Sequence, residues 1–465
     1  MITREQRKVA LLVAGCFFME NLDGTIVTTA APSLATALGV PVASVSSVIT
    51  AYLVTLAVLI PLSGWLAKRF GARPVFLAAI VIFTLASLGC ALSQNLIMLV
   101  LMRILQGVGG AMMVPVGRIA VFSRAAKADL IQIVAFITWP ALLGPVVAPL
   151  LGGILATYAS WRWIFLINVP LGVVAFVVAS RLIKNVEGHE RPGPLDWLGV
   201  LLTAAGFGGL AFSAHLIGES DGWVAYAALA GSIVVTAIAI WHLLQTKHPL
   251  LNLRVLRIRT LRFFTTTGSL YWVVVGAVPF LTPLLFQEGL GWSAVKSGAV
   301  VLFIFVGNIG IKPATTPMLH RLGFRPTLIM ASILLVVTVA ALGTVSSSTP
   351  IVLIAVVVLL SGVARSVGLT VFNTIGVSEV DQADIPDANA LMATTQQLCT
   401  AFGVALAAIA LRLGKVLPIN GWAGAGFTTA YALLALFAAC ALVGAIRLHA
   451  GAGQALRRPR QDSTR

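Results

Sequence analysis

The chain has 465 residues, of which 59% are apolar and only 10% are charged. A soluble domain carries about 25% charged residues, so this composition excludes a soluble enzyme with a water-facing surface and indicates a membrane protein. Lysine and arginine outnumber aspartate and glutamate by 31 to 15, which gives a net charge of +16. The basic residues form short clusters between long apolar stretches, which argues against a nucleic-acid partner and for basic loops beside a lipid bilayer.

Fourteen apolar segments are long enough to cross a bilayer, since a spanning helix needs about 20 mostly apolar residues. Alternating segments of about ten residues, the pattern of a membrane β-barrel, are absent from the sequence. We therefore predict an all-α polytopic membrane protein. The predicted spans are 9–34, 43–66, 74–93, 97–122, 130–157, 162–183, 195–214, 223–245, 260–287, 295–318, 325–346, 350–372, 389–411 and 426–447.

The lysines and arginines predict the orientation of these spans. With the N-terminus in the cytoplasm, 25 of the 31 basic residues lie in cytoplasmic segments and four on the opposite side, while Arg103 and Arg365 lie within spans. Basic loops are retained in the cytoplasm. We therefore expect both termini to be cytoplasmic.

A short repeat relates the two ends of the chain. Residues 69–74, RFGARP, recur 252 residues later as RLGFRP at 321–326. These segments follow the second and the tenth span, so spans 1–6 and 9–14 form paired halves around an inserted pair, an arrangement typical of rocking transporters. We predict a six-helix half over 1–185, the inserted helix pair over 186–250, a second six-helix half over 251–450 and a basic tail over 451–465.

Ionisable side chains inside spans are functional candidates, because each costs about 2.5–3.5 kcal/mol even on a lenient insertion scale. At about 1.5 Å per residue, Asp23 lies ~21 Å from the inner end of the first span and Arg103 ~9 Å from the outer end of the fourth. In a hydrocarbon layer about 30 Å thick they share one depth, so we predict that they pair. Asp23 is the candidate proton-coupling acid, with Arg103 as its partner. Glu20 is a second proton site or a counter-charge for a cationic substrate. The alternative is a permanent ion pair that only joins the two helices.

Arg365 lies nearer the inner side, where it would bind an anionic substrate, pair with an acid or extend to the membrane surface. Other polar and aromatic side chains within spans are candidates for the lining of a substrate cavity, although hydrogen bonds between helices explain such residues more often. We expect no metal site, because the histidines and cysteines lack ligand spacing. The candidate cavity residues are Gln106, Arg365, Trp272, Asn308, Gln396 and Gln397.

Five motifs carry a resemblance to a known family. Residues 22–32 resemble LDxTIVxxALP, and residues 64–73 resemble GxLaDrxGrr. Residues 103–111 match RxxQGxGgA, residues 144–153 match GPxxGPxxGG, and 161–170 read WRWIFLINVP. In this order they resemble the fourteen-helix drug:proton antiporters of the major facilitator superfamily, and the run 109–118 resembles the MdtD branch of that family. The gating residues of these motifs are Gly64, Arg69, Gly71, Arg73, Gly107, Gly144, Pro145, Pro149, Gly152 and Gly153.

The resemblance implies the major facilitator fold in a bacterial cytoplasmic (inner) membrane. It also implies a proton-coupled antiporter that exports drugs or lipophilic cations by alternating access. Such a protein needs a small-molecule substrate, the bilayer and a proton gradient but no cofactor, and it functions as a monomer. The chain departs from the family pattern at Lys68, where the family has aspartate, and at Ala148, where it has glycine.

Two other functions stay open. Arg103, Arg365 and Lys312 favour export of an anionic metabolite such as citrate or iron-citrate, whereas Glu20 and Asp23 favour cations. A membrane sensor or enzyme is the remote alternative. The spans contain no catalytic constellation, so we expect that the protein is not an enzyme.

Overall fold

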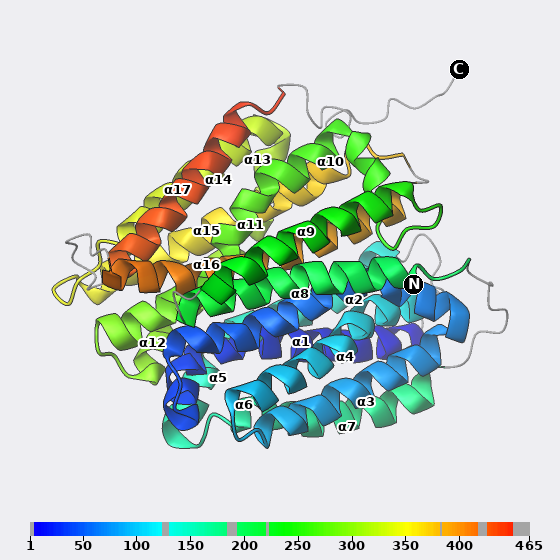
Figure 1. The fold of residues 1–465 in the computed structure, drawn as a ribbon, viewed down its shortest axis with the longest axis horizontal. Helices are drawn as coiled ribbons and strands as arrows, with labels where there is room; N and C mark the ends of the chain where they lie inside the picture. Colours follow the sequence, from blue (N-terminus) through cyan, green and yellow to red (C-terminus); the bar gives the residue numbers. More distant parts are fainter. Residues whose placement is uncertain are drawn as a thin grey trace.

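The computed structural model describes residues 4–122, 130–183, 193–219, 223–381, 384–416 and 426–449. Every regular element within these ranges is helical (Figure 1). The first part of the chain forms α1 (Arg4–Leu38), the short turn η1 (Val42–Val45), α2 (Ser46–Phe70), α3 (Ala72–Ala91), α4 (Leu96–Phe122), α5 (Leu130–Tyr158), α6 (Trp163–Leu166) and α7 (Asn168–Leu182). The middle forms α8 (Trp197–Glu219) and α9 (Trp223–Gln245). The last part forms η3 (Leu253–Arg257), α10 (Arg259–Phe263), η4 (Phe264–Gly268), α11 (Ser269–Leu284), η5 (Leu285–Gly289), α12 (Ala294–Gly310), α13 (Lys312–Leu322), α14 (Phe324–Leu342), α15 (Ile351–Gly376), α16 (Ile385–Val416) and α17 (Phe427–Ile446).

Each of the fourteen predicted spans coincides with a helix or a run of helices. Over the described residues, twelve of them are long and apolar enough to cross a membrane. The other two fall on α5 and α8, where the described side chains give shorter apolar helices. The tenth span, predicted as one segment, divides into α12 and α13 at Ile311. Pro313 lies in the first turn of α13 and has no amide hydrogen for a continuing helix ladder.

The two halves of the repeat make the same contact. Arg73, at the start of α3, donates a hydrogen bond to Ser180 O at the end of α7 (2.9 Å). Arg325, at the start of α14, donates to Ile446 O at the end of α17 (2.8 Å). The glycine before each helix has a positive φ, 90° at Gly71 and 91° at Gly323, which glycine adopts without strain. The repeated loop is therefore a repeated structure. We call the end of the bundle that holds Lys68, Arg69, Arg73, Arg325 and Arg447 the basic end.

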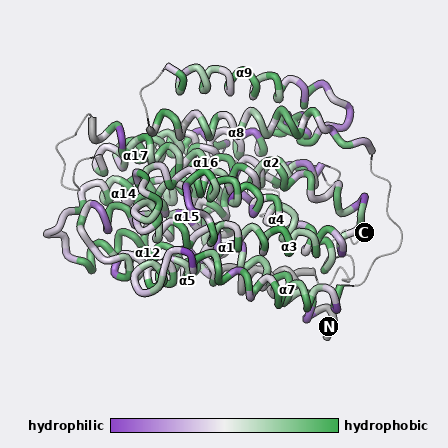
Figure 2. The backbone as a smooth tube through the Cα atoms, turned by 60° about the horizontal axis from the view of Figure 1, so that its bottom comes forward, coloured by the Kyte–Doolittle hydropathy of each residue, from purple (hydrophilic) through white to green (hydrophobic). Residues whose placement is uncertain are grey.

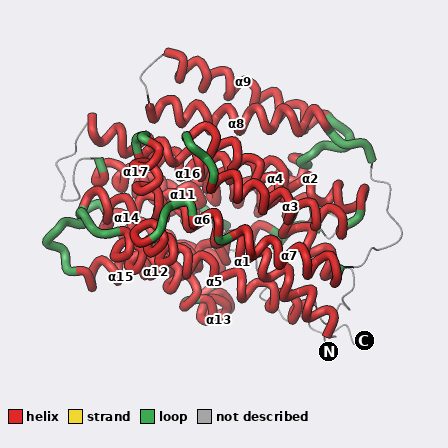
Figure 3. Tube along the Cα trace, turned by 90° about the horizontal axis from the view of Figure 1, so that it is seen from below, coloured by secondary structure: helices red, strands yellow, loops and turns green. Residues whose placement is uncertain are grey.

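The helices pack as two groups with a pair of helices beside them. Helix α1 packs on α5, and α2 and α3 pack on α4, while α11 packs on α16, α12 on α15 and α14 on α17. The two groups meet where α5 contacts α12 and where α2 contacts α16. Helices α8 and α9 pack on each other, α8 also touches α2 and α16, and α9 is the outermost helix on that side (Figures 2 and 3). The exact boundaries of the halves stay a prediction.

The outside of the bundle is apolar. Ile97, Trp223 and Val352 are 74%, 79% and 71% exposed, and hydrophobic residues predominate along the helices in Figure 2. Continuous helices satisfy their own backbone groups, so this surface suits hydrocarbon and not water. The protein is therefore a multi-pass membrane protein.

Candidate functional site

A buried ion pair joins α1 to α4. Arg103 Nη1 lies 2.5 Å from Asp23 Oδ2, and neither side chain has any exposed surface. The sequence places the two residues at one depth, and the structure brings them into contact. An isolated charge in such an environment is costly, whereas a paired and hydrogen-bonded one is tolerated.

Three side chains donate to the Asp23 carboxylate. Besides Arg103 at Oδ2, Gln106 Nε2 (3.0 Å) and Asn168 Nδ2 (2.8 Å) both donate to Oδ1. Gln106 Nε2 also donates to Ser87 Oγ (2.8 Å). Gln106, predicted in the cavity lining, is fully buried and belongs to this network. The sequence does not assign Asn168 or Ser87, although the position of Asn168 inside the WRWIFLINVP motif was an available signal.

Arg103 has further partners that do not depend on Asp23. Its Nη1 donates to Gln106 Oε1 (2.6 Å) and its Nε to Val48 O (3.3 Å). Its guanidinium carbon lies 4.5 Å from the centre of the Tyr52 ring and 5.5 Å from that of Phe165. Cations bind to the faces of such rings. Arg103 can therefore stay buried if its contact with Asp23 weakens.

Glu20 lies on α1 three residues before Asp23, about 4.5 Å nearer the basic end along the axis. It is half-buried, and its Oε2 has no hydrogen-bond partner. Its charged neighbours are Arg118 on α4 and Asp23. Arg118 itself lies 5.1 Å from the centre of the Phe17 ring. Two carboxyl groups thus follow each other along one helix.

The glycine motif of α5 presents two faces. A Cβ atom at Gly144 would lie 2.8 Å from Phe18 O, and one at Gly152 would lie 2.9 Å from Ile26 O, so both glycines let α1 approach within the same half. A Cβ at Gly153 would lie 2.5 Å from Ala294 O on α12. Gly153 therefore permits close contact between the halves, near the end opposite the basic end.

The same contact involves Pro149, and a hydrogen bond between the halves supports it. A Cβ at Gly298 on α12 would meet Pro149 O, four residues after Pro145 on α5. Gln287 Nε2 in η5 donates to Thr29 O on α1 (3.0 Å). The two halves are thus joined at this end.

The remaining motif residues are distributed over the first half. Gly107 packs against Tyr52 O, at 3.1 Å from the position of a Cβ, and against the side chain of Thr55. Gly64 has open space beside it, and Arg69 and Lys68 are exposed at the basic end.

Within the described ranges, the second half contains a buried cation that forms no ion pair with an acidic side chain. Arg365 Nε and Nη1 are buried and have no hydrogen bond, and the guanidinium carbon lies 5.8 Å from the Phe305 ring centre. Trp272 is 2% exposed and its Nε1 also lacks a partner. No hydrogen bond or ion pair within the described ranges connects these side chains, or the half-buried Asn308, Gln396 and Gln397, to Asp23 or Arg103.

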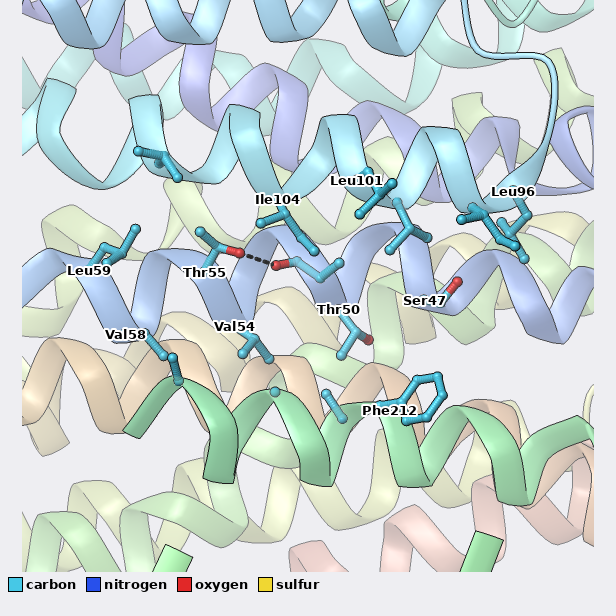
Figure 4. Close-up of a pocket in the computed structure, with 17 residues that line it drawn as sticks. Ser47, Thr50, Val54, Thr55, Val58, Leu59, Leu96, Leu101, Ile104 and Phe212 are labelled. Atoms are coloured by element: carbon cyan, nitrogen blue, oxygen red, sulfur yellow. Dashed lines mark hydrogen bonds between the residues drawn. The ribbon is translucent and has the colours of Figure 1, made fainter. Parts of the chain in front are cut away.

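A separate apolar groove of about 510 Å³ lies between α2, α4 and α8 (Figure 4). Val54, Val58, Leu101 and Ile104 line it, and Phe212 lies on its α8 side. Residues at these spacings share one face of α2 and one face of α4, whereas Val48 and Arg103 project elsewhere. The groove is therefore distinct from the ion pair. In the described part of the chain, no group of three histidine, cysteine or acidic side chains could hold a metal ion.

Comparisons with known proteins agree with this geometry. Residues 13–404 match the model of the Major Facilitator Superfamily. The chain is 37% identical over 404 residues to "Putative multidrug resistance protein MdtD" of Pectobacterium carotovorum subsp. carotovorum (strain PC1), covering 86% of each chain. It is 36% identical over 402 residues to the protein of that name from Serratia proteamaculans (strain 568), covering 86% of this chain and 83% of the relative. The fold is similar to that of the POT family transporter PepTSo, with a TM-score of 0.68 at 15% identity over 96% of this chain and 97% of the other. The chain therefore belongs to the Major Facilitator Superfamily.

Proposed function

We propose that this protein exports an organic solute from the bacterial cytoplasm in exchange for protons, by alternating access between its two halves. The buried Asp23–Arg103 pair carries this proposal, and the multidrug resistance names of the relatives support it. The basic end and both termini face the cytoplasm, since 25 of 31 basic residues belong to that side. One chain supplies the pathway, and the proton gradient supplies the energy without a cofactor.

Protonation of Asp23 is the coupling step in this proposal. The ionised carboxylate accepts three hydrogen bonds from Arg103, Gln106 and Asn168. Hydrogen bonds to a charged group are worth about 1.5–3 kcal/mol each, and a proton on Asp23 weakens them. Arg103 then keeps its bonds to Gln106 Oε1 and Val48 O. The attachment of α1 to α4 thus depends on the proton.

The position of Glu20 supports a route for that proton. Glu20 is the next carboxyl toward the basic end, and its Oε2 is free to accept. Inward movement of one proton yields about 2.3 kcal/mol per 100 mV of membrane potential. A proton that binds Asp23 from the outer side and leaves past Glu20 would drive the solute outward. Glu20 also offers a counter-charge to a cationic solute.

Asp23→Asn tests the coupling. In proteoliposomes with an imposed pH gradient, we expect the variant to insert and to unfold cooperatively but to move no solute against its gradient. Asp381→Asn is the matched control, because Asp381 is an exposed acid outside the helices. Efflux through Asp23→Asn that still collapses when the pH gradient is dissipated would refute the role of Asp23.

A second candidate function is export of an anionic solute, and the unpaired Arg365 favours it. A buried guanidinium without an acidic partner gains most from an anionic ligand. Cells that lack other pumps can be assayed with a lipophilic cation and with citrate in parallel. Export of citrate that is lost in Arg365→Gln would support this candidate, and export of the cation alone would exclude it.

A further inference from the structure

The inserted helix pair reaches both halves at the basic end. A polar cavity of about 490 Å³ lies there, with walls from the end of α2, the segment before α8, the segment after α9 and the first turn of α16. The loops at this end of α8 and α9 lie beside α2 (Figure 3). Six of the residues that line this cavity form hydrogen bonds across it, namely Trp65, Gly193, Asp196, Leu250, Asn252 and Asp387.

The first link joins the first half to the inserted pair. Trp65 Nε1, within the 64–73 motif at the end of α2, donates to Gly193 O at 2.9 Å. Residues Gly193 and Asp196 belong to the short segment that leads into α8. A side chain of the first half thus binds the segment that leads into α8, the first helix of the pair.

The second link joins the two ends of the pair, and Asp196 is its centre. Asp196 Oδ1 accepts from His242 Nε2 on α9 (2.7 Å) and from Gly199 N (2.8 Å), and Oδ2 accepts from Leu250 N after α9 (3.2 Å). The Asp196 side chain is only 4% exposed. The Asp196 carboxylate therefore caps the N-terminus of α8. It also holds the segment after α9 against the segment before α8.

The third link fixes the segment that directly follows the pair to α16 of the second half. Asn252 Nδ2 donates to Asp387 Oδ2 in the first turn of α16 at 2.7 Å. Arg257 lies 3.5 Å from Asp384 beside it, although its side chain is 76% exposed and the pair contributes little. The segment after α9 is thus fixed to α16.

The two helices of the pair pack closely on each other between these links. A Cβ at Gly206 would lie 2.7 Å from Thr236 Oγ1 and one at Gly209 would lie 2.5 Å from Ser232 Oγ, so α8 and α9 pack closely. At the other end of α8, Arg412 of α16 donates a hydrogen bond to Ile217 O. The pair is therefore held to the second half at both of its ends.

We propose that these links form a clasp across the basic end, through which the inserted helix pair limits how far the two halves separate there. The clasp consists of Trp65, Gly193, Asp196, His242, Leu250, Asn252 and Asp387. This proposal rests on the proposed rocking of the two halves. Opening of the basic end would lengthen the chain of hydrogen bonds until one of them breaks. Asp196 and Trp65 are thus positioning residues for transport, which touch neither the solute nor the coupled proton.

Lys68 lies in the wall of the same cavity, at the motif position where the family carries aspartate. The replacement of the family aspartate by Lys68 and the clasp therefore occur in the same cavity. Bonds carried by the inserted pair supply an attachment between the halves beside a motif that lacks its usual acid.

The test measures the separation of the halves directly. In full-length protein with Cys16, Cys90, Cys399 and Cys440 replaced by serine, spin labels at Arg69→Cys and Leu322→Cys report the basic end, one from each of the two repeated loops. Both native side chains are exposed. Double electron–electron resonance is recorded on purified protein in lipid nanodiscs.

Two variants and one control are compared with the labelled parent. Trp65→Phe keeps an aromatic ring but removes the indole N–H together with the five-membered ring that carries it, and Asp196→Ala removes the central carboxylate. We expect the ratio of long to short distances to rise about tenfold in Trp65→Phe, the effect of one hydrogen bond of ~1.4 kcal/mol. The rise should be at least as large in Asp196→Ala, which removes three hydrogen bonds, while Asp381→Ala matches the parent. If Asp196→Ala fails to fold, Trp65→Phe alone decides.

Parent-like distances in the folded variants would overturn the clasp. This readout needs neither solute nor proton gradient, so its failure is distinguishable from failure of the proposed export. Suppose that a clasp variant shows longer distances between the spin labels while its efflux stays coupled to protons through Asp23. That result would support the positioning role.

Discussion

The contact between α5 and α12 leaves no room for a side chain at Gly153. A methyl group at Gly153 would lie 2.5 Å from Ala294 O and 2.9 Å from Ala294 C, both backbone atoms that cannot rotate away. Ordinary contact begins at 3.4 Å, so Gly153→Ala must separate the two helices by about 0.9 Å. Overpacking of this kind costs about 1–3 kcal/mol. Because the contact joins the halves only when this end is closed, the conformational equilibrium should shift about 5- to 150-fold toward opening at that end.

Spin labels at Leu92→Cys and Val352→Cys, in the cysteine-free protein, would measure this opening. Both positions are exposed at the end opposite the basic end, one in each half. We expect a longer distance to gain population in Gly153→Ala.

Two other glycines provide the controls. Gly152→Ala meets Ile26 O at 2.9 Å within one half, so it should lower the melting temperature without changing the distance. Gly231→Ala has nothing within 4 Å and reports only the gain in helix propensity. A Gly153→Ala distance distribution identical to that of Gly231→Ala would refute the reasoning.

Three further predictions concern polar groups, each checked by thermal unfolding of the purified protein. Asn168→Ala removes one donor to Asp23, worth about 1.5–3 kcal/mol, and should melt lower than the parent; Asn308→Ala should not, and equal melting of both would contradict the network. Arg103→Gln leaves Asp23 as a buried charge without its ion-pair partner, at a cost of about 3–5 kcal/mol. Arg365→Gln removes a charge that forms no ion pair within the described residues, and it should melt at or above the parent. The opposite order would show that Arg365 is paired. Burial raises the pKa of Asp196, but hydrogen bonds from His242, Gly199 N–H and Leu250 N–H lower it more, so this pKa lies below its usual value. The stability gained from Asp196 is therefore full above pH about 4 and lost as the pH falls through the lowered pKa. Asp196→Asn should melt below the parent at neutral pH and converge with it in acid, and a constant difference would contradict this.

The positions of the helices along the chain, and the depth of each residue within a span, were predictable from the sequence. The spans follow from runs of apolar residues, and the repeat at 69–74 and 321–326 correctly indicates two loops of one structure, with Arg73 and Arg325 in equivalent bonds. The Asp23–Arg103 pair was predictable for a similar reason, since a bilayer assigns each residue of a span a depth. The break at Ile311 was not predicted, although Pro313 indicates where a helix cannot continue.

The depth of a residue in the bilayer fixes only one coordinate of its side chain. The direction of the side chain also depends on the rotation of the helix about its axis, which a single sequence does not report. The sequence by itself therefore determined where the apolar helices lie, the family motifs and the partner of Asp23. Only the packing of α7 against α1 and α3 placed Asn168 on the carboxylate. Packing alone also divided adjacent glycines of α5 between two neighbours and brought Asp196 to His242, 46 residues away. Each of these contacts depends on which face a helix turns toward its neighbour, and that is settled by the fit of all the helices together.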